Sequence, residues 1–528
     1  PTVSSVTSTT SNGSYKVDEV IAITVTFSEA VTVNTTNGTP QLTLETGSSD
    51  AVVNYASGTG GTTLTFNYTI ASGHTSSDLD YASTSALALN SGTIKDAAGN
   101  SATLTLATPG QSNSLGANKA LIVDTTVPTI SSVNSTASNG TYKIDDVIPI
   151  KITFSEAVTV SGTPQLTLET GTSDAVVNYA SGSGSVDLIF NYTVASTHVS
   201  SDLDYKATNS LALNSGSIND AAGNAATLTL ASPGATNSLG ANKALVVDGV
   251  VATVASVTST VSDDTYKLND VIPVTITFSE AVTVTGTPQL TLETGSSDAV
   301  VNYSSGSGSN TLTFNYTIAT GHATSDLDYT ATNSLALNGG TIKDGAGNTS
   351  VLTLASPGAT NSLGANKALV VDGVVATVSS VSSTISDGTY KTNDVIPITI
   401  TFSEAVTVTG TPQLTLETGT NDAVVNYATG SGSSILTFYY TVSSGHSSSD
   451  LDYVSTSALA LNSGTIKDAA GNTSTLTLAS PGATNSLGAN KAISIDTVTP
   501  TIASVSSTSS NGNYKVGDVI PITVTFSE

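Results

Sequence analysis

Cysteine, methionine, tryptophan and arginine are all absent from this chain of 528 residues. Without cysteine, the chain can form no disulfide, no thiolate metal site and no cysteine nucleophile. Its 14 lysines face 40 acidic residues, which gives a formal net charge of −26. This excess of negative charge argues against nucleic-acid binding through phosphates and disfavours anionic membrane surfaces. The carboxylates must therefore stay dispersed in water or be neutralised by cations.

The chain also lacks any run of about 18 apolar residues, so we expect no membrane span within it. It begins at Pro1 without an initiator methionine or a signal peptide, and it ends at Glu528 in the middle of a repeat. We interpret both ends as cuts through a longer repetitive protein.

One segment recurs along the chain. YKVDEVIAITVTFSEAV starts at Tyr15, and close copies start at Tyr142, Tyr266, Tyr390 and Tyr514, at spacings of 127, 124, 124 and 124 residues. A period of this length is one domain. Enzymes seldom need four near-copies of one domain, whereas a spacer or a fibre gains length from each copy. We predict four domains and the start of a fifth, over residues 1–127, 128–251, 252–375, 376–499 and 500–528.

Short alternating runs of Thr, Val, Ile and Leu between Gly, Asn and Ser predict an all-β chain without a convincing amphipathic helix. Seven or eight short strands per repeat indicate an immunoglobulin-like β-sandwich. A domain that enters at one pole and leaves at the other needs an odd number of crossings, so the run at 86–90 or one of the last two is not a separate crossing. In the first repeat the candidate strands are Thr2–Thr9, Val20–Ser28, Gln41–Thr46, Ala51–Ala56, Thr62–Ile70, Ala86–Asn90, Ala102–Ala107 and Lys119–Val123.

The linkers between repeats are too short to act as flexible tethers. They run over Val123–Thr129, Val247–Thr253, Val371–Thr377 and Ile495–Thr501. Pro128 and Pro500 stiffen two of them further. We therefore expect neighbouring domains nearly to touch, in a tandem array that forms an elongated rod with roughly 40 Å for each domain.

Acidic residues recur at fixed places in the repeat. Glu29 follows the strand in FSEAV, Asp96 lies in the turn KDAAGN, and Asp124 lies in the linker. Following the strands brings the first two to the pole where the preceding linker arrives, so three carboxylates converge at each junction. Such a set would repel itself unless a cation neutralised it, and hard oxygen ligands suit Ca²⁺. The predicted metal ligands are Glu29, Asp96, Asp124, Glu156, Asp220, Asp248, Glu280, Asp344, Asp372, Glu404, Asp468 and Asp496.

A second acidic set is expected at the opposite pole, in the loop before the long strand and in the motif SDLDY. It comprises Glu19, Asp78, Asp80, Asp146, Asp202, Asp204, Asp270, Asp326, Asp328, Asp394, Asp450 and Asp452. Asp-x-Asp alone is weak evidence for a metal, so we carry these residues only as a possible second ligand set. The alternative for both sets is ordinary turn chemistry, in which Asp caps its own backbone. Turn chemistry accounts for each acid singly and not for their convergence.

Catalytic chemistry finds little support. One histidine occurs per repeat (His74, His198, His322 and His446), with no second histidine or thiolate to complete a zinc site. We interpret it as a loop residue. No Ser/His/Asp set stands out, so we predict no enzyme. A lysine recurs at Lys119, Lys243, Lys367 and Lys491. This lysine could form an isopeptide cross-link or simply face solvent on the last strand, and we favour the second alternative.

The motifs FSEAVTV, GTPQLTLETG and GTIKDAAGN, with the linker VDTTVPT, resemble the bacterial immunoglobulin-like repeats of giant surface and secreted proteins. These include calcium-dependent adhesins of the type I secretion (RTX) kind and their extender regions. The resemblance covers the whole chain. It implies Ca²⁺ between domains, an extracellular or cell-surface location and a spacer or filament role.

We therefore expect a structural spacer or fibre whose junctions are stiffened by Ca²⁺, as part of a longer bacterial surface adhesin or extracellular filament. Its partners would be the neighbouring repeats of the same chain, with lateral self-association into fibres as a further expectation. The alternative is an adhesin module that recognises a glycan or another surface. That alternative needs a distinctive exposed cluster in one repeat only, and the sole singularity we note is the NTTN insertion in the first repeat.

Overall fold

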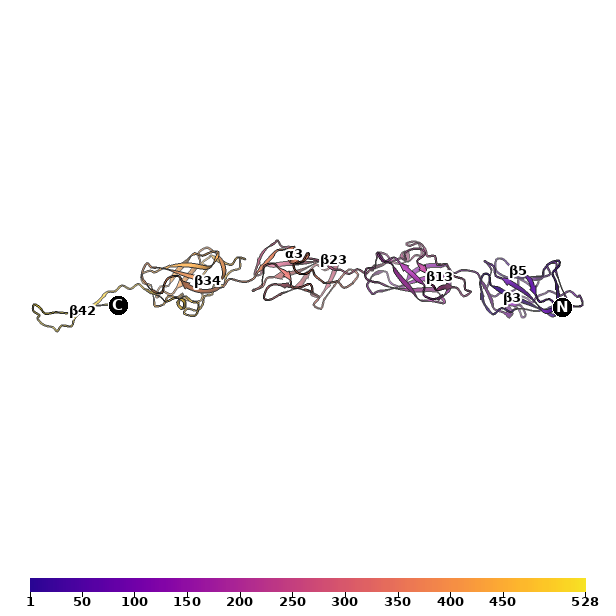
Figure 1. The fold of residues 1–528 in the computed structure, drawn as a ribbon, viewed down its shortest axis with the longest axis horizontal. Coiled ribbons are helices and arrows are strands. Elements are labelled where there is room, and N and C mark those ends of the chain that lie inside the picture. Colours follow the sequence, from indigo (N-terminus) through magenta and orange to yellow (C-terminus); the bar gives the residue numbers. More distant parts are fainter. The chain divides into compact units, whose positions relative to one another are not determined.

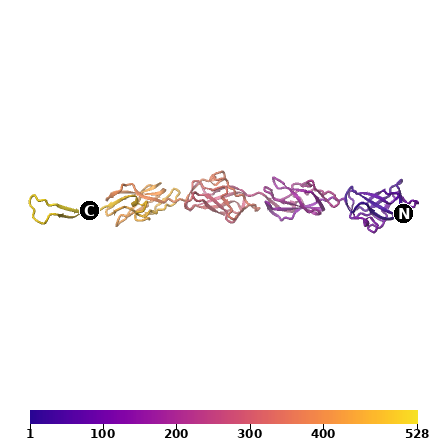
Figure 2. The ribbon, with the colours of Figure 1, turned by 60° about the horizontal axis from the view of Figure 1, so that its bottom comes forward.

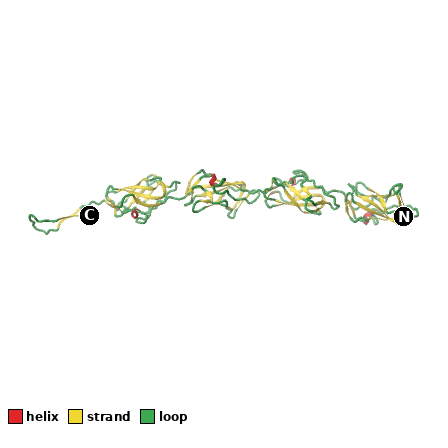
Figure 3. Cartoon of the chain, viewed as in Figure 1, coloured by secondary structure: helices red, strands yellow, loops and turns green.

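The computed structural model describes residues 1–528. The chain divides into two compact units, residues 1–251 with 346–348, and residues 252–345 with 349–528. Apart from residues 346–348, the first unit holds the first two repeats and the second holds the remainder. Figures 1 and 2 show each of the four complete repeats as a compact bundle of strands. Figure 3 shows that strands and loops make up almost all of each bundle, with only a short turn of helix.

The first repeat contains ten strands and one helical turn. They are β1 (Val3–Ser8), β2 (Gly13–Tyr15), β3 (Val20–Asn34), β4 (Gln41–Leu44), β5 (Ala51–Ser57), β6 (Gly61–Thr69), β7 (Thr75–Ser76), β8 (Leu87–Ala88), β9 (Thr93–Lys95), α1 (Leu115–Asn118) and β10 (Leu121–Asp124). Hydrogen bonds join them in the order β1-β3-β6-β5-β4-β8, with β9 also paired to β3, and in a smaller sheet of order β2-β10-β7.

The period-two pattern of the sequence explains the core. In β3, Ile21, Ile23 and Val25 are fully buried, because successive side chains of a strand point to opposite faces. In β6 the same alternation buries Phe66 and Tyr68. Each of the four repeats has its own cluster of buried side chains, so the chain contains four hydrophobic cores.

The later repeats follow the same plan. Repeat 2 contains β11 (Ile130–Ser135), β12 (Gly140–Lys143), β13 (Val147–Ser161), β14 (Gln165–Leu168), β15 (Ala175–Ser181), β16 (Ser185–Thr193), β17 (Val199–Ser200), β18 (Leu211–Ala212), β19 (Ser217–Asn219), α2 (Leu239–Asn242) and β20 (Leu245–Asp248). Repeat 3 contains β21 (Val254–Ser259), β22 (Asp264–Lys267), β23 (Val271–Thr285), β24 (Gln289–Glu293), β25 (Ala299–Ser305), β26 (Ser309–Thr317), β27 (Ala323–Thr324), β28 (Asp328–Tyr329), β29 (Leu335–Ala336), β30 (Thr341–Lys343), α3 (Leu363–Asn366) and β31 (Leu369–Asp372).

Repeat 4 contains β32 (Val378–Ser383), β33 (Gly388–Tyr390), β34 (Val395–Thr409), β35 (Gln413–Leu416), β36 (Ala423–Thr429), β37 (Ser433–Thr441), β38 (Ser447–Ser448), β39 (Leu459–Ala460), β40 (Thr465–Lys467), α4 (Leu487–Asn490) and β41 (Ile493–Asp496). The start of the fifth repeat forms a hairpin of β42 (Ile502–Ser507) and β43 (Ile522–Phe526), whose residues are all exposed. The structure contains no helix long and apolar enough to cross a membrane.

Two expected strands need correction. The strand expected at Val20–Ser28 continues to Asn34, because its register on β6 shifts between Thr26 and Val31 and its last residues pair with β9. Glu29 therefore lies in a bend within β3 and not after its end. The strand expected at Ala102–Ala107 is wrong: within it only Thr103 forms an isolated bridge, with Thr2. Leu106 of this segment is buried, as the alternating pattern predicts. No ladder forms, because the amides of Ala102, Thr103 and Leu106 each donate to a different segment of the chain.

The recurrent lysine is also placed differently from expectation. Lys119 does not lie on the last strand; it ends the helical turn α1, in which the Ser114 hydroxyl accepts a hydrogen bond from the Ala117 amide. Its ammonium donates a 2.7 Å hydrogen bond to the carbonyl oxygen of Thr10, and the copies in the other repeats make the same bond. This lysine therefore ties the helical turn to the loop after the first strand.

Candidate metal centre

Three acidic side chains meet in the first unit at the boundary between repeats 1 and 2. Glu156 lies in the bend of β13, Asp220 follows β19, and Asp124 is the last residue of β10. Each offers a carboxylate oxygen, and the three oxygens lie within 4.8 Å of one another. The linker and two segments of the following repeat thus contribute one carboxylate each.

A tight turn fixes Asp220 in this position. One carboxylate oxygen accepts a 2.8 Å hydrogen bond from the Asn224 amide, and the other accepts a 2.7 Å bond from the Asn224 side chain. The turn requires Gly223 because its φ of 88° lies in the left-handed region. Asp220 is only 5% exposed as a result. The linker residue is fixed similarly, since Oδ1 of Asp124 accepts a 3.0 Å bond from the Thr126 amide.

The second unit contains the same arrangement between repeats 3 and 4, formed by Asp372, Glu404 and Asp468 within the same 4.8 Å limit. Asp468 is 3% exposed, and its Oδ1 accepts a 2.8 Å bond from the Asn472 amide. Oδ2 of Asp468 and Oε1 of Glu404 are buried without a hydrogen-bond partner. Buried polar atoms are nearly always paired, so two carboxylate oxygens without a hydrogen-bond partner in one cluster are compatible with a cation-binding site.

The electrostatics of both clusters agree with that interpretation. Burial raises the pKa of Glu156, and the neighbouring Asp124 and Asp220 raise it further. The pKa of Glu404 is raised by burial and then by Asp372 and Asp468. In both cases the charged form is disfavoured by lost hydration and by like charge, and a bound cation would remove both penalties.

The geometry fits one divalent cation in each cluster. Oxygens bound to the same Ca²⁺ at about 2.4 Å are at most about 5 Å apart, which the carboxylate separations satisfy. Three carboxylates supply between three and six oxygens, and Ca²⁺ accepts six to eight in a flexible geometry. Mg²⁺ would demand a stricter octahedron. The clusters could therefore hold a metal ion and are compatible with Ca²⁺.

The remaining members of the first acidic set have other surroundings. Glu29 pairs with the ammonium of Pro1 at 3.2 Å. Asp96 accepts hydrogen bonds from Asn100, which lower its pKa, and Asp496 is exposed. The expected set of Asp248, Glu280 and Asp344 is divided between the two units, the first residue lying in one and the others in the second; it stays a prediction.

An asparagine in the same turn joins the repeats directly. The side-chain amide of Asn224 donates a 2.9 Å bond to the carbonyl oxygen of Asp124, and the Lys16 ammonium reaches the Gly223 carbonyl at 2.9 Å. In the second unit, Asn472 donates to the carbonyl oxygen of Asp372 at 2.9 Å and accepts from the Leu268 amide at 2.8 Å. Sequence reasoning missed this residue, although GN follows the turn acid in every repeat.

Comparisons with known proteins address the fold. Residues 1–108 match the family model described as a bacterial Ig-like domain. The fold is immunoglobulin-like. No curated protein matches the chain.

Among solved structures, an I-band fragment of titin matches with 6% identity and a TM-score of 0.25, over 66% of this chain and 95% of that one. E. coli alpha-2-macroglobulin in its native conformation matches with 10% identity and a TM-score of 0.13, over 85% of this chain and 27% of that one. The S-layer protein rSbsC(31-844) matches with 12% identity and a TM-score of 0.12, over 89% and 67%. Likenesses at these scores carry no conclusion about function.

The second acidic set of the Ig-like repeats bonds to backbone amides. Glu19, Asp146, Asp270 and Asp394 each accept from the lysine amide three residues earlier. Asp80, Asp204, Asp328 and Asp452 each accept from the following tyrosine and from a glycine 30 residues later, as in Gly234 with Asp204. Asp78, Asp202, Asp326 and Asp450 are exposed. Metal binding by this set stays a prediction.

The variant Asp204→Asn tests whether Asp204 only holds its loop through hydrogen bonds or also binds a metal ion. The Gly234 amide would face an amide nitrogen or lose its partner, so we expect a loss of about 1–3 kcal/mol in the unfolding free energy. If the residue serves only to hold the loop, chemical denaturation gives the same loss in Ca²⁺ and in EDTA. Asp202→Asn, at the exposed neighbour, is the matched control. A loss confined to Ca²⁺ would instead establish Asp204 as a metal ligand.

Asn472→Ala tests the direct link between Ig-like repeats. The variant strips the Leu268 amide and the Asp372 carbonyl of their partner, so we expect a stability loss of about 2 kcal/mol in the second unit. Asn100→Ala is the control, because Asn100 bonds to Asp96 of its own turn. Urea unfolding of both variants measures the difference. Equal losses would mean that the bonds across the junction add nothing.

Proposed function

We propose that the chain is an extracellular spacer of tandem Ig-like repeats, stiffened by Ca²⁺ at its junctions, within a longer bacterial surface adhesin or extracellular filament. The observation that carries the proposal is the pair of orphaned oxygens on Glu404 and Asp468, inside a carboxylate cluster that also includes the linker residue Asp372. An ion at that point would bind the linker to the following repeat and so restrict the hinge.

The repetition supports a mechanical role. The clusters recur at equivalent places in two different units, and each combines a linker acid with two acids of the next repeat. A spacer uses such a joint at every junction, because length and stiffness add along an array. Extracellular calcium, which is millimolar, would fill sites of the modest affinity that extracellular modules show.

Small-angle scattering of the whole chain in Ca²⁺ and in EDTA tests the proposal. We expect a longer maximum dimension and a narrower distribution of dimensions in Ca²⁺. The matched variants are Glu404→Gln, which removes one ligand of a cluster, and Glu29→Gln, at the same position of a repeat but outside the two clusters. Identical curves in Ca²⁺ and EDTA, with bound calcium undetectable by calorimetry, would overturn calcium stiffening and leave a spacer held by its short linkers alone.

A further inference from the structure

A cavity recurs on the outer face of repeats 2, 3 and 4. Its volume is about 470 Å³ in repeat 2, about 580 Å³ in repeat 3 and about 600 Å³ in repeat 4. The cause is a strand that changes partners: residues Ala423–Asn426 of β36 pair with β35, and only Tyr427 and Thr429 pair with β37. The strands β36 and β37 therefore splay apart, and the cavity opens between them.

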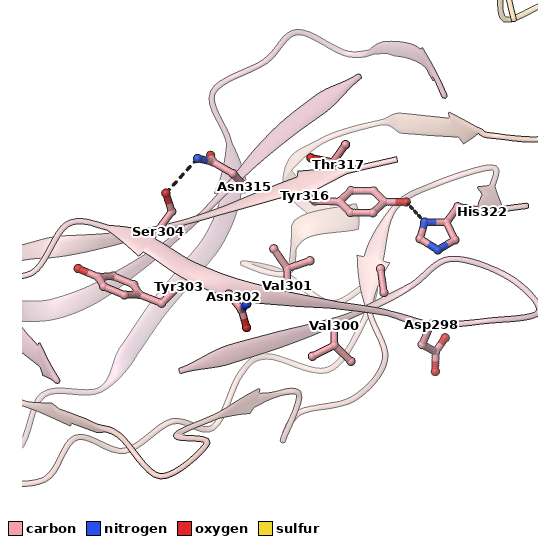
Figure 4. Close-up of a pocket in the computed structure, with 11 residues that line it drawn as sticks. Asp298, Val300, Val301, Asn302, Tyr303, Ser304, Asn315, Tyr316, Thr317 and His322 are labelled. Carbon is pink, nitrogen blue, oxygen red and sulfur yellow. Dashed lines mark hydrogen bonds between the residues drawn. The ribbon is translucent and has the colours of Figure 1, made fainter. Parts of the chain in front are cut away.

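The wall of this cavity carries a histidine held in one tautomer. In repeat 3, the hydroxyl of Tyr316 lies 2.9 Å from Nδ1 of His322 (Figure 4). The Ala319 amide donates to the same nitrogen at 3.3 Å. Because Nδ1 accepts from the amide, the proton of the neutral ring lies on Nε2. Asp298 and Val300 line the same cavity, and Val300 is 58% exposed. The cavity thus combines a donor, a carboxylate and apolar surface.

Repeat 4 differs from the others by one aromatic residue. Tyr439 stands where the earlier repeats have Asn67, Asn191 and Asn315. It lines the cavity and is 51% exposed. Asn315 is bonded to Ser304 at 3.0 Å in repeat 3 (Figure 4), whereas repeat 4 has Ala428 in place of that serine. Ala56 and Ala180 occupy the same position in repeats 1 and 2, so the aromatic ring of Tyr439 is what distinguishes repeat 4.

We propose that the cavity of repeat 4 binds a neutral saccharide, with one pyranose ring stacked on Tyr439 and hydroxyl groups bonded to Asp422 and His446. A sugar ring offers an apolar C–H face for an aromatic ring and hydroxyls that both donate and accept, which matches the groups around this cavity. A volume of about 600 Å³ is within the range of small-ligand sites.

The net negative charge of the chain favours neutral saccharides over acidic ones. Asp422 is exposed beside the cavity, and the net charge of −26 repels uronic and sialic acids. An extended peptide fits less well, because the open edge of β36 spans only four residues before Tyr427 pairs with Phe438 again. The inference goes beyond the spacer role and uses no residue of the calcium clusters.

Affinity electrophoresis of the whole chain through gels that contain dextran, amylose or galactomannan tests the proposal. We expect retardation by at least one of these neutral polysaccharides. Tyr439→Asn restores the residue of the other repeats, so it should fold normally and weaken binding by about five- to ten-fold through loss of the aromatic contact. Asn315→Tyr combined with Ser304→Ala should build a second site in repeat 3 and increase retardation.

Two measurements separate this proposal from calcium stiffening. Retardation in the gels, run in Ca²⁺ and in EDTA, reports ligand binding in the cavity, whereas the melting temperature in the same two conditions reports calcium binding at the carboxylate clusters. Retardation that Tyr439→Asn leaves unchanged would overturn the proposal, as would no retardation by any of the three polysaccharides. Binding of a lysine-rich peptide that depends on Tyr439, without saccharide binding, would overturn it in favour of a protein ligand.

Discussion

We expect EDTA to lower the melting temperature of this chain by about 6 °C relative to millimolar Ca²⁺. A ligand at ten times its dissociation constant, as for a site of about 10⁻⁴ M in about 1 mM Ca²⁺, stabilises the folded state by about 1.4 kcal/mol, and each kcal/mol shifts the melting of a domain this size by about 4 °C. Circular dichroism at both conditions measures the shift. An unchanged melting temperature would mean that the clustered acids are solvated turns.

Glu404→Gln should have opposite effects with and without calcium. In EDTA the variant removes a half-buried charge whose pKa is raised by burial and by Asp372 and Asp468, so it should stabilise the second unit. In Ca²⁺ it loses a ligand, so it should reduce the stabilisation by the ion. Glu29→Gln should change little in either condition, because Glu29 is exposed. A variant that behaves alike in both conditions contradicts the assignment of Glu404 as a ligand.

The same carboxyl gives a dependence on pH. Its pKa in the folded chain is raised above the ordinary glutamate value of 4.5, so just above that pH the folded state holds a proton that the unfolded state has lost. Without calcium, this contribution to stability is present below pH 4.5 and falls as the pH rises through the raised pKa. With calcium the trend should reverse, since the ion binds only the ionised form.

The sequence predicts the immunoglobulin-like fold because burial in a strand follows a period of two. The alternation at Ile23, Val25 and Phe27 places these side chains in the core without knowledge of any partner strand. The extension of β3 past Ser28 could not be predicted in the same way, because a β-bulge and pairing with β9 sustain it. The parallel pairing of β2 with β10 joins residues over a hundred positions apart, which no local pattern specifies.

In the candidate site, too, the sequence predicts some features and not others. Repetition and strand direction were enough to place Glu156 and Asp220 beside Asp124, since each acid follows a recognisable motif. Two other hydrogen bonds, from the Gly234 amide to Asp204 and from the Leu268 amide to Asn472, connect backbone amides to side chains far away in the sequence. Because every residue except proline has a backbone amide, the residue type does not indicate which amide makes such a bond. Tyr439 was visible in the sequence, but its exposure beside a cavity was not.

The second large effect is expected at alkaline pH, where buried tyrosines should unfold the repeats. Each repeat buries two tyrosines such as Tyr440 and Tyr453, which are at most 2% exposed. Burial, and to a smaller extent the charge of Asp452, raises the pKa of Tyr453 to about 12; burial alone raises the pKa of Tyr440 to about 12. The same pairs are Tyr68 and Tyr81, Tyr192 and Tyr205, and Tyr316 and Tyr329.

Ionisation of a buried tyrosine destabilises the folded repeat as the pH rises. An unfolded phenol ionises near pH 10 and the folded one near pH 12, so the stability supplied by the neutral buried form is full below pH 10 and is lost as pH rises toward 12. At about 1.4 kcal/mol for each unit, the loss is on the order of 2–3 kcal/mol per tyrosine. Two tyrosines per repeat are enough to remove much of the stability of a typical domain.

Tyr453→Phe distinguishes this mechanism from general charge repulsion. At neutral pH the variant orphans the carbonyl of Ala479, to which the Tyr453 hydroxyl donates at 2.7 Å, and should cost about 1–2 kcal/mol. Between about pH 10 and pH 12 it should lose stability less steeply than the parent chain, because one phenol no longer ionises on unfolding. Urea unfolding across that interval, with far-ultraviolet circular dichroism as the signal, gives both slopes. Parallel slopes would assign alkaline unfolding to repulsion among the carboxylates instead.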